Sequence, residues 1–231
     1  MVRKRRPPLV IRAVRPIWAK CNDVALRIRT VPSVEPPAAP YLASRITPKY
    51  CDSVAYAPAD YAYLRKVRRM LHAGADDVIY DLGCGMGRFL CLMARRNVRR
   101  CVGVELDPEL CEIAQTNARH LRGRKAPIGI VCADAATADL SEGTIYYMYN
   151  PFGADTLREV VANLRRSWAD HPRSLQIVYY NALHECLLAS EPWLEKYREF
   201  KTLSGMLVSF WRSCGVPASF RPNVYSRSRG I

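Results

Sequence analysis

The sequence predicts an α/β protein of three layers, in which a mostly parallel sheet is covered by helices on both faces and finishes in an antiparallel C-terminal hairpin. Two observations carry this prediction. Short apolar runs alternate with stretches of helical length, and the last two β-like runs are separated only by Ser204-Gly205. The 231 residues are 49% hydrophobic and 24% charged, which fits one domain with an N-terminal extension.

The expected elements follow in regular order along the chain. Short apolar runs predict strands at residues 77–82, 100–106, 128–133, 144–150 and 174–180. Amphipathic stretches predict helices at residues 59–72, 86–96, 108–121, 155–169 and 182–189. Residues 196–203 and 206–213 predict the hairpin. Gly74 is expected to be the C-cap of the first of these helices.

The chain is expected to divide into four parts. These are a basic amphipathic segment (1–30), a proline-rich linker or strap (31–50), the main domain (51–220) and a flexible basic tail (221–231). The prolines exclude a helix over the linker. Apolar residues of the first segment recur at helical spacing, namely Val10, Val14, Ile17, Cys21, Val24 and Ile28.

The net charge of the chain limits the classes of molecule that it is expected to bind. The chain has 35 Lys and Arg against 21 Asp and Glu, a net charge of +14, which implies an acidic partner: a protein surface first, nucleic acid second. The basic segment reads as a nucleic-acid arm, a helix over residues 9–29 on an anionic membrane surface, a transit peptide or a solubilising helix at the domain edge. No apolar run reaches the 18 residues of a membrane-spanning helix.

Cysteine usage predicts a reducing compartment. The nine cysteines are odd in number, form no C-x-x-C pair and mostly sit in apolar runs, as Cys101 and Cys132 do, so they are expected to be buried thiols. The four histidines are scattered, so no metal site is expected. This usage fits the cytoplasm, with an organelle matrix as the alternative.

The most informative stretch is an acid followed by three glycines at alternate positions, Asp81-Leu-Gly83-Cys-Gly85-Met-Gly87, directly after a predicted strand. At the carboxyl end of a strand, such glycines permit close approach of a ligand. The dinucleotide-binding pattern G-x-G-x-x-G/A fails, because Arg88 occupies the position that needs a small residue. Since a carboxylate here repels pyrophosphate, the loop favours a ligand with a positive group and no phosphate.

Two further acids end the next two predicted strands. Glu105 lies 20 residues after Gly85, where a carboxylate can accept both hydroxyls of a ribose. Asp134 can meet the edge of a purine or cap the following helix. Parallel strands end at the same edge of a sheet, so we expect Asp81, Glu105 and Asp134 around one site.

The runs D-L-G-C-G-M-G, V-G-V-E and A-D, followed by Asn-Pro-Phe on the fourth strand, resemble the class I S-adenosylmethionine-dependent methyltransferases over residues 76–181. The resemblance implies a Rossmann-like methyltransferase sheet and S-adenosylmethionine as cofactor. It implies Asp81 near the methionine ammonium, Glu105 on the ribose and Asp134 near the adenine N6, with the three glycines beneath the methionine. The implied cofactor-binding set is Asp81, Gly83, Cys84, Gly85, Gly87, Glu105, Leu106, Asp134, Ala135 and Asn150.

The fourth strand ends in Asn150-Pro151-Phe152, beside the expected methyl group. The Asn150 carboxamide and the Pro151 carbonyl can accept hydrogen bonds from an amine whose lone pair stays free, and Phe152 offers a ring face. The run resembles the [D/N]-P-P-[F/Y] motif of amino-methylating enzymes, with one proline instead of two. Tyr56, before the first strand, is similar to a lid residue of the non-SET protein-lysine methyltransferases. The catalytic candidates are Asn150, Pro151, Phe152 and Tyr56.

These residues predict an enzyme that transfers a methyl group from S-adenosylmethionine to a nitrogen, with a protein lysine as the first acceptor. Two alternatives remain open. One is an adenine-type N-methyltransferase of RNA or DNA that docks through its basic surface. The other is a non-catalytic module that binds S-adenosylmethionine and acts as an interaction protein.

Replacement of Glu105 tests the cofactor assignment. Glu105→Ala is expected to weaken S-adenosylmethionine binding by about 1–3 kcal/mol, because charge-assisted hydrogen bonds are lost. Calorimetric titration, with a nicotinamide dinucleotide as the control ligand, measures the effect. Unchanged affinity would remove Glu105 from the site.

Overall fold

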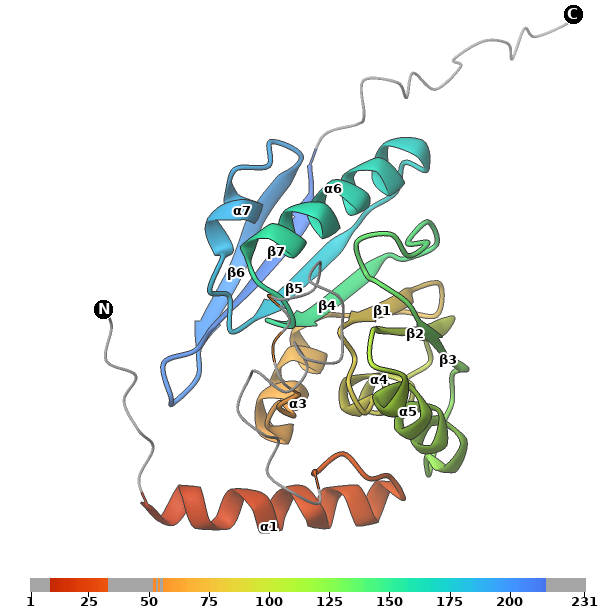
Figure 1. Ribbon diagram of the computed structural model, residues 1–231, viewed down its shortest axis with the longest axis vertical. Helices are drawn as coiled ribbons and strands as arrows, with labels where there is room; N and C mark the ends of the chain where they lie inside the picture. Colours follow the sequence, from red (N-terminus) through yellow and green to blue (C-terminus); the bar gives the residue numbers. More distant parts are fainter. Residues whose placement is uncertain (1–8, 33–51, 53, 55, 215–231) are drawn as a thin grey trace, which may run out of the picture.

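The computed structural model describes residues 9–32, 52, 54 and 56–214, with side chains from residue 16 onward (Figure 1). Its centre is a seven-stranded sheet of order β3-β2-β1-β4-β5-β7-β6. The strands are β1 (Val78–Leu82), β2 (Arg100–Glu105), β3 (Ile128–Cys132), β4 (Ile145–Tyr149), β5 (Gln176–Tyr180), β6 (Leu194–Lys201) and β7 (Leu207–Ser213). Neighbouring strands among the first five are parallel, whereas β7 is antiparallel to β5 and β6. The predicted fold class is confirmed.

Helices cover both faces of the sheet (Figure 1). The described helices are α1 (Leu9–Leu26), α3 (Tyr61–Met70), α4 (Arg88–Met93), α5 (Pro108–His120), α6 (Ala154–Asp170) and α7 (Glu185–Ala189), of which α3 to α7 pack on the sheet. The core is correspondingly double. One cluster of buried side chains joins the sheet to α3, α4 and α5, and the other joins its opposite face to α6 and α7. This two-sided burial explains why β1, β4 and β5 read as continuous apolar runs.

The end of α3 differs from the prediction. Leu71 closes the helix by donating its N–H to the Val67 carbonyl, and the left-handed residue that follows is His72, with φ 36°. The Gly74 N–H donates instead to the Asp77 carboxylate at 2.7 Å. Gly74 as C-cap is therefore wrong, because the chain leaves the helix earlier than a glycine signal suggests.

The described cysteines differ in burial. Cys84, Cys91, Cys101 and Cys111 are buried as expected, but Cys21, Cys132 and Cys186 are exposed and Cys214 is half-buried. Cys132 ends β3, which is the edge strand and which alternates between partly buried and exposed positions. An apolar run on an edge strand therefore misled the prediction for Cys132.

The N-terminal segment forms the predicted helix, but among the members of its apolar stripe whose side chains are described, only Ile28 packs in the core. Ile17 is 65% exposed and Val24 is 76% exposed, and both lie on α1. Leu26 and Ile28, at the end of the segment, enter the core instead. The predicted linker from residue 33 and the predicted tail (221–231) lie outside the described residues. In the part of the chain that is described, no helix is long and apolar enough to cross a membrane.

A buried carboxylate fixes this segment to the domain. Asp23 is 5% exposed and accepts hydrogen bonds from the Thr30 and Val31 amides, the Thr30 hydroxyl and the Tyr61 hydroxyl at 2.5–3.1 Å. The guanidinium of Arg88 lies 3.9 Å from Asp23 and donates to Thr30 Oγ1 at 2.6 Å. The end of α1, the start of α3 and the start of α4 therefore share one polar cluster.

A second polar link joins the same segment to the glycine loop. The Asn117 side chain of α5 donates to the carbonyls of Arg29 and Met86, both at 2.8 Å, and accepts from the Arg29 amide at 2.7 Å. Asn117 is only 3% exposed. A buried amide with this full set of partners fixes the position of residue 29 relative to residue 86.

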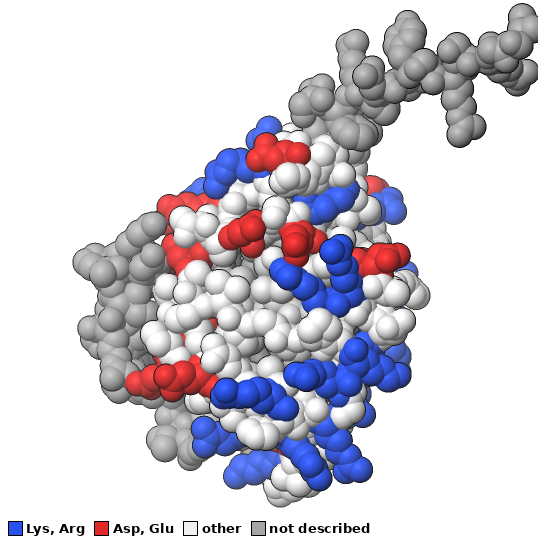
Figure 2. All heavy atoms as spheres, turned by 90° about the vertical axis from the view of Figure 1, so that its right-hand side faces the viewer, with Lys and Arg blue, Asp and Glu red and all other residues white. Residues whose placement is uncertain are grey.

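Basic side chains gather at the amino ends of β2 and β3 (Figure 2). The loops that precede these two strands meet there, because the Arg95 guanidinium lies 3.3 Å from the place of a Cβ on Gly123. Burial and the charges of Arg96, Arg95 and Arg65 lower the pKa of Arg68, which adds α3 to the group. We call this surface the basic patch; it comprises Arg68, Arg95, Arg96, Arg99, Arg122 and Arg124.

Loss of the Asp23 carboxylate is expected to destabilise the fold strongly. Asp23→Ala leaves a buried guanidinium and four donors without their acceptor, so the free energy of unfolding should fall by about 3 kcal/mol or more. Urea unfolding measures the change. Asp155→Ala, which removes a 90% exposed carboxylate paired with Arg158, is the control and should cost under about 1 kcal/mol. Equal losses in both variants would contradict the anchoring role.

Candidate active site

A cavity opens at the carboxyl edge of the sheet, where β1, β2, β3 and β4 end. Asp81, Glu105 and Asp134 all line it, as their places at three strand ends predict. Of the other residues singled out in the sequence, the following also line it: Gly83, Cys84, Gly85, Leu106, Ala135, Asn150, Pro151, Phe152 and Tyr56. The described residues include no group of His, Cys, Asp or Glu that could hold a metal ion.

Gly87 does not line the cavity. It has φ 78° and stands at the N-cap of α4, and a Cβ there would meet Ala114 of α5 at 3.5 Å. The third glycine therefore serves the turn into the helix and the packing of α4 near α5. Its place beneath the methionine stays a prediction.

The first two glycines admit protein side chains to the loop. A Cβ on Gly83 would lie 2.3 Å from Pro151, and a Cβ on Gly85 would lie 2.2 Å from the Tyr56 ring. Both glycines have positive φ, 73° and 53°. The loop is thus clamped between the end of β4 and Tyr56, and neither glycine tolerates a side chain without displacing that neighbour.

Glu105 fastens the glycine loop as well as facing the cavity. Its carboxylate accepts from the Gly85 amide at 2.7 Å, the Leu106 amide at 2.8 Å and the Asp107 amide at 3.0 Å. Burial raises the pKa of Glu105, and these three N–H donors oppose the rise. A carboxylate has about four acceptor positions, so Glu105 retains one for a ribose hydroxyl.

Asp81 is the most strongly perturbed acid of the cavity. It is 3% exposed, and the described residues offer it no hydrogen-bond donor. Burial, followed by the charge of Glu105, holds the pKa of Asp81 well above its ordinary value. A buried carboxyl group beside a second acid favours a cationic group in the cavity, because a positive charge relieves both effects.

Asp134 turns the chain after β3. Its Oδ1 accepts from the Ala136 amide at 2.9 Å, and its carbonyl accepts from Ala138 at the same distance. This is the turn role that strand-end acids commonly have. Asp134 combines it with a place in the cavity wall, next to Ala135.

The end of β4 is held by three hydrogen bonds. Asn150 has φ 40°, is 6% exposed and accepts from the Tyr179 hydroxyl at 2.8 Å through Oδ1. The Pro151 carbonyl accepts from the Val54 amide at 2.9 Å, and the Gly153 amide donates to the Asp52 carbonyl at 3.0 Å. One lone pair therefore remains on Asn150 Oδ1 and one on the Pro151 carbonyl.

Residues 54 and 56–59, which we call the covering segment, form one wall of the cavity. Tyr56 lies against Gly85 and donates its hydroxyl to the Thr30 carbonyl at 2.9 Å. Burial raises the pKa of Tyr56 far above neutrality, so the phenol stays protonated. The predicted covering position of Tyr56 agrees with this placement.

Several cavity residues escaped the sequence reasoning. Asn181 has φ 54° and follows β5 as Asn150 follows β4, a parallel that the sequence offered. Arg88 counted only as the residue that breaks a dinucleotide pattern, yet it lines the cavity. Tyr147 and Tyr149 lie in an apolar strand and read as packing residues, but both reach the cavity.

The parallel sheet with an antiparallel last pair, together with an acid-lined glycine loop at its carboxyl edge, defines the class I S-adenosylmethionine-dependent methyltransferases. Residues 79–181 match the family model described as a methyltransferase domain. This part of the chain is therefore a class I methyltransferase domain. The predicted class and its cofactor, S-adenosylmethionine, are confirmed.

Known proteins similar to the chain agree with this class. A protein-lysine N-methyltransferase from Saccharolobus islandicus (strain REY15A) is 33% identical over 101 residues, which is 43% of this chain. The match spans 62% of that relative's length. An RNA methyltransferase from Salinibacter ruber, solved with S-adenosyl-L-homocysteine, is 22% identical with a TM-score of 0.52, covering 74% of this chain and all of that one. A ribosomal protein L11 methylase from Lactobacillus delbrueckii subsp. bulgaricus is 14% identical with a TM-score of 0.54, covering 68% and 80%. The two structures support the fold.

Neutralising Asp81 is expected to raise the stability of the fold and to weaken cofactor binding. Its raised pKa means that the folded state holds a proton more tightly than the unfolded state, so stability falls as pH rises through this interval. Asp81→Asn should therefore unfold at higher urea concentration than the wild type at pH 7 and bind S-adenosylmethionine at least about tenfold more weakly.

The pH profile provides the check on that prediction. Wild-type affinity should fall on acidification, as Asp81 becomes protonated, and cofactor binding should release a proton. Calorimetric titration in buffers of different ionisation enthalpy detects the released proton. An Asp81→Asn variant that binds as tightly as the wild type, or releases the same proton, would refute this role.

Proposed function

We propose that the chain transfers the methyl group of S-adenosylmethionine to a nitrogen, with the side-chain amine of a protein lysine as acceptor. The observation that carries the proposal is the continuity of the cavity. The acid-lined glycine loop lines the same cavity as Tyr149, Asn150, Phe152 and Asn181, which we call its second end. Amide oxygens accept hydrogen bonds from the N–H groups of an amine, and aromatic rings contact its apolar stem or its cationic form, so this lining suits a lysine side chain.

The residues of this second end have positioning roles. S-adenosylmethionine supplies a methyl group already activated by its sulfonium. The free lone pair of Asn150 Oδ1 would accept an N–H of the amine, and Tyr179 fixes the carboxamide so that this oxygen keeps its direction. Phe152 and Tyr149 line the same end and would contact the methylene stem.

No general base is part of this proposal. The described residues that line the cavity include no histidine or lysine, and burial raises the pKa of Tyr56 and Tyr147. An amine that enters in its neutral form becomes a methylammonium as the bond from sulfur to the methyl group breaks, and it then gives one proton to water. The rate should therefore rise with pH until the acceptor amine is deprotonated.

A nucleic-acid acceptor is the second candidate, because the chain carries a net charge of +14. The position of the basic patch counts against it. The patch flanks the amino ends of β2 and β3, and its basic side chains gather on the face seen in Figure 2. The cavity lies at the carboxyl ends of these strands. A duplex or strand held on the patch would lie at the sheet edge opposite the cavity. An acidic protein partner suits the same charge, and the curated relative named above is a protein-lysine methyltransferase.

Transfer of a labelled methyl group to lysine-containing proteins and to RNA tests the proposal. Label in protein that survives nuclease and is traced to lysine supports it. Label in RNA, together with RNA binding that falls steeply with salt, would favour the second candidate. Cofactor binding with no turnover on any acceptor would favour a non-catalytic module.

Asn150→Ala is expected to lower kcat by about 100-fold or more, because the acceptor amine loses its positioning oxygen. Cofactor affinity should change less than about threefold, since Asp81 and Glu105 are untouched. Tyr179→Phe, which removes only the partner of Asn150 Oδ1, should give a smaller loss. Asn22→Ala, at a half-buried position of α1 outside the cavity lining, is the matched control. Full activity in Asn150→Ala would exclude the positioning role.

A further inference from the structure

Two buried hydrogen-bond donors of the cavity wall have no partner in the described structure. Arg88 is 4% exposed and Tyr147 is 2% exposed, and both line the cavity. Neither the Nη2 atom of Arg88 nor the hydroxyl of Tyr147 makes a hydrogen bond to any described residue. Buried donors without acceptors are costly, so both are expected to meet an acceptor supplied by a bound molecule.

Arg88 is already fixed by its other nitrogens. Its Nε donates to Thr30 Oγ1 at 2.6 Å, its Nη1 donates to the Ala59 carbonyl at 2.8 Å, and its guanidinium lies over the Tyr61 ring at 4.6 Å. Asp23 stands 3.9 Å away, beyond hydrogen-bond distance, and its oxygens accept from Thr30, Val31 and Tyr61. Nη2 is therefore the one guanidinium nitrogen without a protein acceptor in the described chain.

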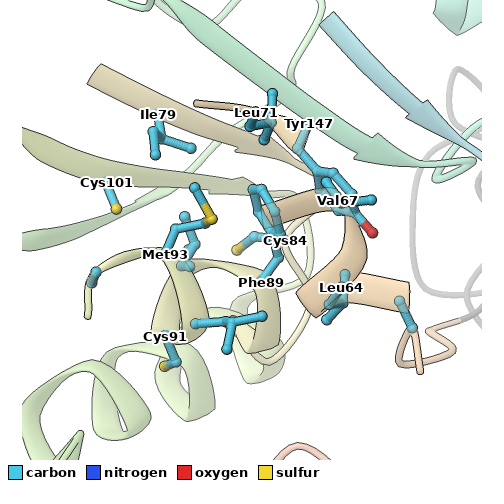
Figure 3. Close-up of a cluster of buried hydrophobic side chains, with 14 of the residues drawn as sticks. Leu64, Val67, Leu71, Ile79, Cys84, Phe89, Cys91, Met93, Cys101 and Tyr147 are labelled. Atoms are coloured by element: carbon cyan, nitrogen blue, oxygen red, sulfur yellow. The ribbon is translucent and has the colours of Figure 1, made fainter. Parts of the chain in front are cut away.

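Tyr147 is equally constrained. Its ring stacks on Phe89, the residue after Arg88, with centroids 3.8 Å apart and planes at 17°. Figure 3 shows the Tyr147 hydroxyl directed away from β4 toward α3, where Leu64, another lining residue, lies. Burial holds the pKa of Tyr147 well above its ordinary value, with Arg88 acting in the opposite direction. The phenol is thus a fixed donor at neutral pH.

These donors face the same end of the cavity as Asp81. In the register of β1 and β4, Asp81 pairs with Tyr147, and the charge of Asp81 acts on Tyr147. The charge of Arg88 acts on Tyr147 as well. One buried carboxylate without a hydrogen-bond donor therefore lies close to two donors that have no hydrogen-bond acceptor in the described chain, although Asp23 stands 3.9 Å from Nη2. An amino-acid zwitterion, with its ammonium and carboxylate on one carbon, satisfies both requirements together.

We propose that Arg88 Nη2 and the Tyr147 hydroxyl bind the carboxylate of the methionine moiety of S-adenosylmethionine, while Asp81 binds its ammonium. The proposal rests on the cofactor of the proposed function and adds the two residues that recognise its negative end. Arg88 thereby carries two tasks, because the same guanidinium holds the N-terminal segment through Thr30. The cavity should then discriminate between ligands that differ only in that carboxylate.

Equilibrium titration of the full chain with three ligands tests the proposal. The ligands are S-adenosylmethionine, its decarboxylated form, which keeps the ammonium, and methylthioadenosine, which lacks both groups. The wild type is expected to bind S-adenosylmethionine at least about tenfold more tightly than the decarboxylated form. Tyr147→Phe should lower the affinity for S-adenosylmethionine alone, by about three- to tenfold, so that this preference collapses.

Arg88→Met should remove the preference more completely, with methylthioadenosine affinity within about twofold of the wild type. Two matched controls lie outside the cavity and should leave every affinity unchanged. Tyr197→Phe loses a hydroxyl bonded to Gln176, and Arg96→Met loses a guanidinium bonded to the Arg68 and Ala73 carbonyls. If Arg88→Met fails to fold, Tyr147→Phe decides alone.

The outcomes separate this proposal from the proposed function. A Tyr147→Phe variant that keeps the full preference, or loses affinity for all three ligands equally, overturns the carboxylate site and leaves the cofactor assignment intact. A wild type that binds S-adenosylmethionine with the expected preference but methylates no lysine contradicts only the acceptor. A wild type that binds none of the ligands overturns both.

Discussion

The buried Asp23 carboxylate is the contact on which the rest of the site depends. It gathers the Thr30 amide and hydroxyl and the Tyr61 hydroxyl, and it places a negative charge beside Arg88. Thr30 then holds Tyr56 through its carbonyl, and Tyr56 lies on Gly85. A continuous series of polar contacts therefore leads from the end of α1 to the glycine loop. The segment before the main domain is in this sense part of the site that it covers.

Two buried acids of the cavity, Asp81 and Glu105, differ in how well the protein stabilises their ionised forms. Asp81 is buried beside Glu105, and both have raised pKa values because burial penalises their ionised forms. Glu105 offsets its burial with three backbone donors, whereas Asp81 does not. Stability and ligand recognition consequently oppose each other at Asp81. Such opposition is typical of groups that serve binding rather than folding.

Sequence reasoning reached the features that have a local pattern and missed those that depend on distant partners. Strand ends place Asp81, Glu105 and Asp134 together, so their common site followed from periodicity alone. Asp23 is one acid in a basic segment, and its partners lie up to 65 positions away. No local sequence pattern therefore predicts its anchoring role. The two glycines that were expected to clear space for a ligand clear it for Pro151 and Tyr56. Glycine in such a loop indicates that another group approaches the backbone closely, but it does not show whether that group is a ligand or a protein side chain.

The hydroxyl of Tyr56 ties one wall of the cavity to the chain that follows α1, through the Thr30 carbonyl. Thermodynamic reciprocity then applies to the two ends of this tie. A ligand that stabilises the Tyr56–Thr30 contact therefore also stabilises the packing of the chain that follows α1, by the same factor. A partner that bound the side of α1 where Ile17 and Val24 are exposed would in return change the affinity of the cavity for its ligand. The outer face of a helix far from the strand ends is thus a potential effector surface.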